Sequence, residues 1–470
     1  MLDALTTRVE SNYPGYHLEV RGRDREPEYV AHRSALRQRA ATTAIGLDCT
    51  ALLQQYVAWF GDGHLFVGGR PPVSTAEDSV RLRAAAPRVS DTEARIIDYI
   101  DTERNHLDPV EGIWMDPAGQ KIAIRQDGAA GRSRRFVAFV VESTNAAWNP
   151  GDVRAELIAL PDGSYDVVLY DEVRARTRLH VFNRRHAGGG RLQRDGLLLH
   201  MAPVTWGKLH PVRPGQEGLI DPLEPRAPTA RTLNETTIVF HVPSNVPSHA
   251  ARLRALVEQY RGALARAETL IIDLRGNEGG STFVTDVFMP FLITADQQPH
   301  GYLAGGAPAV LAAPDNIAYF ERMSWAPPGL VQRLRQAEPG TLVPFADPAD
   351  ADPEPARAAP DSGVMSPRNV AILTDEMTVS AAEAFVLKAM RYGSVTLFGE
   401  PTGGSIDYQT VGIVRFGCRE AGLYVGYPTI VGSDRLPEGG ARATGIVPDV
   451  RIDADDADPI ARILEYYARR

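Results

Sequence analysis

Short apolar runs alternate with a helical pattern in the C-terminal half of the chain. Thr269–Asp273 and Val370–Leu373 are each short enough for a buried strand. A pattern rich in alanine and other helix-forming residues runs from Ala381 and stops near Gly393, and another apolar run, Val395–Phe398, follows it. Buried strands joined through helices are typical of α/β folds, so we expect an α/β core in this part of the chain.

Two other patterns precede this core. Residues 1–107 have the apolar spacing of a mostly helical region. Residues 108–212 carry short strand patterns separated by turn signals, which predict an inserted antiparallel β-barrel or β-sandwich domain. The core domain then covers 213–470, with a long lid-like loop expected at 297–367. The helices expected in the N-terminal region are Leu2–Val9, Ala31–Ala44, Leu47–Phe60 and Thr92–Glu103.

Composition narrows the class of protein. A length of 470 residues predicts two or three domains, and 44% hydrophobic with 23% charged residues is typical of a globular chain. The net charge of −9 argues against nucleic acid and against an anionic membrane surface as partners. Two cysteines do not make a disulfide scaffold, and no Cys and His spacing predicts a zinc site. We expect neither a metal nor another cofactor.

The chain has no apolar run long enough to span a bilayer, so no membrane span is expected. Its first residues lack the basic and apolar regions of a signal peptide. The sequence leaves two locations open: periplasmic or secreted if this is a trimmed mature form, and cytoplasmic otherwise. It also leaves open whether the chain forms a homo-oligomer.

Ser380 is the first candidate for chemistry. It stands where a helix leaves a buried strand, so it is expected at the carboxyl edge of the sheet beside free helix amides. A plain structural role is also open, because Ser380 and Glu383 have the spacing of a capping box. Taken alone, the pattern favours the cap over a nucleophile.

Other segments change that balance. Gly279 and Gly280 follow a predicted strand, and glycines there let backbone amides face a developing negative charge. In chain order, the motifs Asp273–Gly280, Thr378–Glu383, Gly399–Gly404 and Gly445–Asp449 resemble the core of the S41 serine peptidases. This family includes the tail-specific or C-terminal processing proteases and the tricorn-core and CPAF relatives. The resemblance covers about half the chain and implies a crotonase-like or ClpP-like core with a serine nucleophile.

The resemblance also offers two kinds of residue as the general base that activates Ser380. Tail-specific proteases use a lysine after the turn matching Gly399–Gly404, but Ser405 stands there in this chain. The tricorn-like branch uses an N-terminal histidine and a glutamate about sixty residues after the serine. Glu438 lies 58 positions after Ser380, and His64 follows an apolar helix, so the resemblance implies a triad of Ser380, His64 and Glu438. No PDZ domain is evident.

A serine, a histidine and a carboxylate are also the residue types that nucleophilic catalysis needs. A serine hydroxyl needs a base to take its proton, and an imidazole does so when a carboxylate fixes its tautomer. The Ala381 amide with that of Gly279 or Gly280 would hold the oxyanion. Ser405 and Asp407 are weaker candidates for substrate binding. Non-catalytic roles stay open for two residues of this triad. His64 also fits a histidine in a surface loop, and Glu438 also fits a solvated residue in a turn.

The function expected from these residues is a serine endopeptidase acting on peptide or protein substrates. Two alternatives from other classes stay open. A catalytically silent protein of the same fold would bind a peptide or a small apolar ligand. A crotonase-type acyl-CoA enzyme would use the same amide pair for a thioester oxyanion, without needing Ser380 or Glu438.

Overall fold

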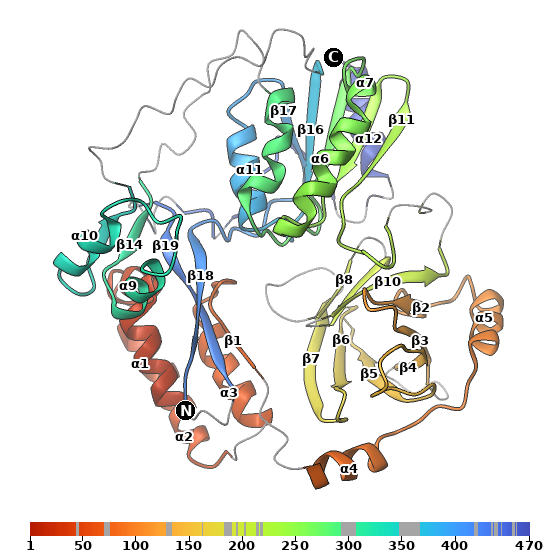
Figure 1. The fold of residues 1–470 in the computed structure, drawn as a ribbon, viewed down its shortest axis with the longest axis horizontal. Coiled ribbons are helices and arrows are strands. Elements are labelled where there is room, and N and C mark those ends of the chain that lie inside the picture. Colours follow the sequence, from red (N-terminus) through yellow and green to blue (C-terminus); the bar gives the residue numbers. More distant parts are fainter. Residues whose placement is uncertain are drawn as a thin grey trace. The chain divides into compact units, whose positions relative to one another are not determined.

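The structure, a computed structural model, divides into two compact units (Figure 1). One unit consists of Met1–Pro72, Ala230–Phe240 and Asn245–Arg470, and the other of Val73–Thr229 and His241–Ser244. We call them the sheet unit and the barrel unit. The residues described are 1–43, 47–69, 76–127, 134–161, 163–182, 190–193, 196–201, 204–212, 216, 220–292, 307–346, 367–417, 422–433, 436, 440–442, 444–453, 456 and 458–470.

A six-stranded sheet forms the centre of the sheet unit, with strand order β11-β12-β13-β16-β17-β20. Its last four strands are parallel to one another, as expected for buried apolar runs joined through helices. The strands are β11 (Thr229–Asn234), β12 (Thr237–His241), β13 (Thr269–Asp273), β16 (Asn369–Thr374), β17 (Val395–Gly399) and β20 (Val450–Arg451). The predicted α/β character of this part of the chain is confirmed.

Helices cover the two faces of this sheet, because alternate strand residues point to opposite sides. On one face, Ile271 and Leu373 pack in a cluster with Ile463 of the last helix. On the other, the Phe288 ring packs edge-to-face on Phe240 of β12 and at a tilt on Phe385. The helices are η2 (Pro247–His249), α6 (Ala250–Gln259), α7 (Arg261–Leu264), η3 (Thr282–Phe288), α8 (Met289–Leu292), α11 (Ala381–Ala389) and α12 (Pro459–Ala468).

The N-terminal helices pack on a second sheet of the same unit. Buried residues such as Leu5 and Leu53 form one cluster with Val425 and Tyr427 of that sheet. The helices are α1 (Leu2–Asn12), the π-helix η1 (Tyr16–Arg21), α2 (Glu26–Ala40) and α3 (Leu47–Ala58). This packing joins the first sixty residues to the C-terminal part of the chain.

The strands of the second sheet come from segments that are far apart in the sequence. Its order is β1-β19-β14-β15, and β18 also pairs with β19. The strands are β1 (Phe66–Gly68), β14 (Ala309–Leu311), β15 (Leu342–Pro344), β18 (Tyr408–Arg415) and β19 (Tyr424–Val431). Helices α9 (Pro314–Phe320) and α10 (Leu330–Gln336) lie between β14 and β15 in the chain, so the described part of the expected lid, 307–346, is built into this sheet.

The barrel unit closes nine strands in the order β10-β2-β3-β4-β5-β6-β7-β8-β9 (Figure 1). The strands are β2 (Gly112–Met115), β3 (Lys121–Gln126), β4 (Arg135–Glu142), β5 (Val153–Ala159), β6 (Tyr165–Tyr170), β7 (Arg176–Phe182), β8 (Gly190–Gln193), β9 (Leu198–Met201) and β10 (Val204–His210); α4 (Ala76–Ala85) and α5 (Glu93–Thr102) precede them. Of the two expected architectures, the barrel is the one found. Its pairs are antiparallel except β7–β8, which is parallel.

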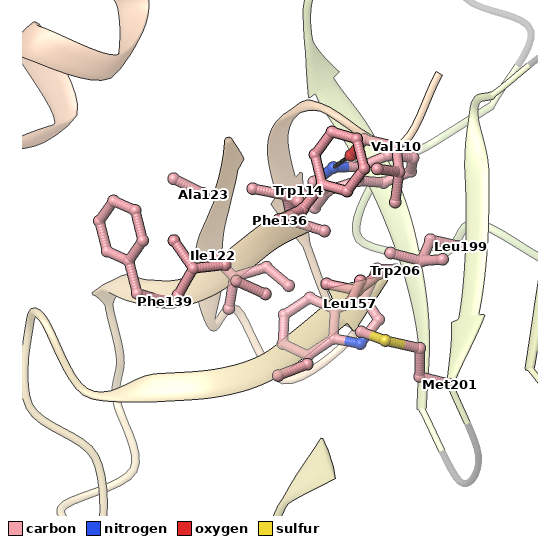
Figure 2. Packing of buried hydrophobic residues seen from close by; sticks show 14 of the residues in the cluster. Val110, Trp114, Ile122, Ala123, Phe136, Phe139, Leu157, Leu199, Met201 and Trp206 are labelled. Carbon is pink, nitrogen blue, oxygen red and sulfur yellow. Dashed lines mark hydrogen bonds between the residues drawn. The ribbon is translucent and has the colours of Figure 1, made fainter. Parts of the chain in front are cut away.

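The barrel interior is filled with large apolar side chains. Trp114 and Trp206 are almost fully buried there, and the Trp114 indole donates to the Val110 carbonyl at 3.0 Å (Figure 2). A buried indole normally finds such a partner. The barrel unit therefore has a hydrophobic core of its own. Among the described residues, no helix has the length and apolar character needed to cross a bilayer.

Candidate active site

Three neighbouring strands of the six-stranded sheet end at one edge. β13, β16 and β17 are parallel, and their register places Thr374 beside Gly399. The carboxyl ends of such strands are where open α/β sheets bind ligands. Three loops leave this edge: the glycine loop (residues 274–281), the serine turn (residues 375–380) and the outer turn (residues 400–407).

Ser380 ends the serine turn in a backbone conformation that L-residues rarely adopt. Its φ is 58° and its ψ is −120°. Such strain persists only where the surrounding structure imposes it, and it clusters at active sites. A sharp, strained turn between strand and helix also exposes the nucleophilic serine of α/β-hydrolases. Ser380 is half-buried and stands at the N-cap of α11.

The cap expected as the plain alternative is present as well. Ser380 and Glu383 occupy the two positions of a capping box, and the Glu383 carboxylate accepts from the Ser380 amide at 2.9 Å. Glu383 is fully buried and fastens the outer turn to the start of α11. Its further donors are the Thr402 hydroxyl at 2.6 Å, the Gly404 amide at 2.8 Å, and the Ser405 amide and hydroxyl at 2.9 Å each.

The glycine loop packs directly against Ser380. A Cβ on Gly279 would lie 2.7 Å from the Ser380 Cβ and 3.0 Å from the Ala381 nitrogen. The φ of Gly279 is +82°, a conformation that glycine adopts without strain. The two candidate oxyanion segments, near Gly279 and at Ala381, are thus in contact.

The hydrogen bonds of this loop distinguish its two glycines. The Gly279 amide donates to the Asn277 Oδ1 at 2.9 Å. Among the described residues, the amides of Gly280 and Ala381 donate to no acceptor. The Ala381 amide directly follows Ser380, and the Gly280 amide follows Gly279, which packs against Ser380. Backbone amides that donate to no protein acceptor can stabilise a negative charge that develops on a substrate oxygen.

His64 lies in the loop between α3 and β1. Its amide donates to the Asp62 Oδ1 at 2.8 Å, and the Tyr13 hydroxyl donates to the Asp62 Oδ2 at 2.7 Å. The Nδ1 of His64 is buried and has no hydrogen-bond partner in the part of the chain that the structure describes. Within the same residues, no hydrogen bond joins His64 to Ser380.

Glu438 falls outside the described residues, but the chain on both sides of it is anchored. Leu436 is buried in a cluster with Tyr408. The Asp407 carboxylate accepts from the Ala441 amide at 2.7 Å and from the Arg442 amide at 2.9 Å. Burial raises the pKa of Asp407 even though these amides favour its ionised form.

The anchors on the two sides of Glu438 also lie close to the other candidates. A Cβ on Gly404 would meet the Ala441 carbonyl at 2.4 Å, so the outer turn packs on that segment. The Ser405 hydroxyl accepts from the Ser380 amide at 2.8 Å. Ser405 and Asp407, predicted to bind substrate, therefore have polar atoms engaged within the protein.

A group of side chains that sequence reasoning missed connects the His64 loop to this segment. The Tyr13 ring packs on Tyr408 with centroids 5.9 Å apart, and Tyr408 donates to Glu19 at 3.0 Å. Arg442 lies 3.5 Å from Glu19 and above the Tyr408 ring. Their one sequence signal is the run Asn12-Tyr-Pro-Gly15, which predicts a break after the first helix.

Asp375 contributes to this site although it lies outside the sequence motifs described above. It stands at the start of the serine turn, and both carboxylate oxygens lie 3.0 Å from the Gly276 nitrogen of the glycine loop.

In the described part of the chain, no group of three or more His, Cys, Asp or Glu side chains is arranged to hold a metal ion.

Comparison with known proteins gives one family. Residues 316–452 match the sequence model of peptidase family S41. This span is under a third of the chain and includes the serine turn, α11, the outer turn and β19. No curated protein matches the sequence.

Several solved structures are similar to the chain at low identity. Mature CPAF has 12% identity and a TM-score of 0.44, covering 100% of this chain and 95% of that chain. The photosystem II D1 C-terminal processing protease has 12% identity and a TM-score of 0.36, covering 98% and 95%. A putative S41 protease from Bacteroides fragilis has 12% identity and a TM-score of 0.31, covering 91% and 98%.

Proposed function

Because this chain belongs to peptidase family S41 and is a serine peptidase, we propose that it hydrolyses peptide bonds through an acyl-enzyme formed on Ser380. The observation that carries the proposal is the strained backbone of Ser380 at the carboxyl edge of the sheet, in contact with the glycine loop. Strain of this kind costs about 1–3 kcal/mol, so a residue that needed only to cap a helix would not require it.

The proposed oxyanion site consists of the amides of Ala381 and Gly280. Gly279 was the other candidate, and the use of its amide by Asn277 favours Gly280 as the second donor. Donors fixed before the reaction stabilise the tetrahedral intermediate without reorganisation, and each is worth about 10²–10³ in kcat.

His64 is proposed as the general base and Glu438 as the acid that orients it. The buried Nδ1 of His64 supports this role, because a buried ring nitrogen without a partner requires an acceptor or donor. In the proposed reaction His64 takes the Ser380 proton, the hydroxyl oxygen attacks the carbonyl, and His64 returns the proton to the leaving amine. Water then hydrolyses the ester, again with His64 as base.

The proposed substrates are extended peptides or unfolded protein segments. Ser405 and Asp407 are held by Ser380, Glu383 and the Ala441 segment, which favours a role in holding the site rather than in binding substrate. We also propose that the parallel part of the six-stranded sheet, with its helices, is a crotonase-like or ClpP-like core.

The decisive experiment measures peptide hydrolysis and fluorophosphonate labelling of the full chain and its variants. We expect near-total loss of turnover in Ser380→Ala and His64→Ala, and a large partial loss in Glu438→Gln, because triad members act as a unit. His106→Ala is the control, since His106 is exposed in the barrel unit. Full turnover in Ser380→Ala would refute the proposal, and full turnover in His64→Ala would refute the choice of base.

A further inference from the structure

Asp375 connects two of the loops that form the proposed site. Its Oδ1 accepts from the Met377 amide at 3.0 Å and from the Thr378 hydroxyl at 3.2 Å, both within its own turn. The Gly276 amide of the glycine loop donates to Oδ1 and Oδ2, each at 3.0 Å. One carboxylate thus binds both loops at once.

Further bonds run between the same two loops on either side of Asp375. The Thr378 hydroxyl donates to the Leu274 carbonyl at 3.1 Å, and the Val379 amide donates to the Asn277 carbonyl at 3.0 Å. Gly276 lies four residues before Gly280, and Thr378 lies two residues before Ser380. These contacts hold the segment that carries the Gly280 amide against the segment that carries Ser380.

We propose that Asp375 is a positioning residue, which sets the distance between the Gly280 amide on the glycine loop and the Ser380–Ala381 segment. The inference rests on the proposed function, because it assigns Asp375 to the same oxyanion site. Asp375 itself touches neither substrate nor the reacting atoms. It acts through Gly276 at the start of the glycine loop, while Asn245 holds the end that carries Gly280: the Asn245 amide donates to the Gly279 carbonyl at 3.0 Å, and the Asn245 carbonyl accepts from the Ser281 amide at 2.7 Å.

The ionisation of Asp375 supports this role. Burial of its carboxyl group raises the pKa to about 6, although the Gly276 amide and Arg275 oppose the shift. The charged groups facing it come from the end of β13: Arg275, and Asp273, which Arg275 binds through two bonds of 2.9 Å. Glu383 on α11 is turned instead to the outer turn. Keeping an ionised Asp375 at neutral pH therefore costs stability.

Asparagine is the substitution that separates positioning from folding. Asp375→Asn can keep the Oδ1 contacts, but it replaces Oδ2, 3.0 Å from the Gly276 nitrogen, with an Nδ2 donor that repels the donating Gly276 amide. We expect kcat to fall by about 10²-fold with KM little changed, because a displacement of about 1 Å costs that much. The control is Asp116→Asn in the barrel unit, where the carboxylate also accepts two backbone amides.

The pH dependence of stability gives a second measurement, which tests whether the Asp375 carboxyl is buried as the structure places it. The folded pKa of Asp375 exceeds the unfolded value of about 3.9, so its favourable contribution is full below pH ~4 and is lost as pH rises through ~6. Asp375→Asn lacks this loss. We expect the urea midpoint of the variant, relative to wild type, to be higher at pH ~7.5 than at pH ~5.

The outcomes distinguish this inference from the proposed function. Turnover that survives in Ser380→Ala refutes the function and with it the role of Asp375. Loss in Ser380→Ala, with kcat in Asp375→Asn within about twofold of wild type, refutes the positioning role alone. If Asp375→Asn does not fold, Thr378→Val decides, since it removes the hydroxyl shared by Asp375 and Leu274. Unchanged kcat in a folded Thr378→Val refutes the inference, and a selective fall in kcat supports it.

Discussion

At the scale of single residues, the contact between Gly279 and Ser380 gives the most direct prediction. Gly279→Ala would place a methyl group 2.7 Å from the Ser380 Cβ and 2.9 Å from the Val379 carbonyl, so the serine turn must move. We expect kcat to fall by about 10²-fold or more, as it does when an oxyanion donor is lost. Steady-state kinetics and fluorophosphonate labelling measure this loss.

Gly119 provides the matched control for that variant. Its φ is +80°, close to the +82° of Gly279, but a Cβ there would meet no atom within 4 Å. Gly119→Ala therefore imposes the backbone penalty alone, about 1–2 kcal/mol of unfolding free energy. Equal catalytic loss in the two variants would show that strain, and not the contact with Ser380, explains the effect.

Part of this residue-level picture follows from sequence and part does not. The position of Ser380 between an apolar run and a helical pattern is enough to predict its place at the sheet edge. The φ of 58° is not, because contacts from the glycine loop and the outer turn impose it. Likewise, only the bond to Asn277 distinguishes the Gly279 amide from that of Gly280.

At the scale of elements, the break after α1 is connected to the proposed base. Tyr13 is fully buried and donates to Asp62, whose other oxygen accepts from the His64 amide. Tyr13→Phe removes this donor and leaves a buried carboxylate oxygen unpaired, at a cost of about 1.5–3 kcal/mol. We expect slower turnover at saturating peptide, because the loop that carries His64 loses a support.

Tyr29→Phe is the comparison that isolates this effect. Tyr29 is buried in the same helical cluster and donates to a carboxylate, Glu10, at 2.6 Å, but it makes no hydrogen bond to the His64 loop within the described residues. The two variants should lose similar stability by chemical denaturation and differ in kcat. Equal kcat values would remove Tyr13 from the support of the proposed base.

Elements with local signals were predicted well. The apolar run Thr269–Asp273 forms β13 with those bounds, and the helix expected at Thr92–Glu103 is α5, which Thr92 caps through the Arg95 amide. No strand was expected at β18 or β19, since Gly412, Gly426 and Pro428 weaken their strand pattern. Pairing with distant segments decides such strands.

At the scale of the whole molecule, each unit has its own core, so we predict that the two units unfold in separate transitions. The barrel unit contains a buried ion pair, Arg174 Nη2 to Asp152 Oδ2 at 2.6 Å, beneath Trp148. Asp152→Ala leaves the Arg174 charge uncompensated and should cost about 3–5 kcal/mol.

Hydrogen exchange resolved at the level of individual peptides can test whether the two units unfold separately. Asp152→Ala should lower protection across β2–β10 and leave protection of β13 and β16 unchanged. Loss of equal size in both units would contradict independent cores. Trp148 is buried, and its stacking with Arg174 at 3.8 Å from the ring centroid has no sequence signal. The parallel pairing of β7 with β8 could not be predicted either, since turn signals indicate hairpins.

The contacts of Ser405 determine whether a lysine at this position could replace the proposed histidine as general base. Its hydroxyl lies between the Ser380 amide and the buried Glu383 carboxylate. A lysine introduced at this position would meet that carboxylate and remain a paired ammonium ion, unable to accept a proton. We therefore expect that Ser405→Lys alone would not supply a general base beside Ser380, and that Glu383 would have to change with it.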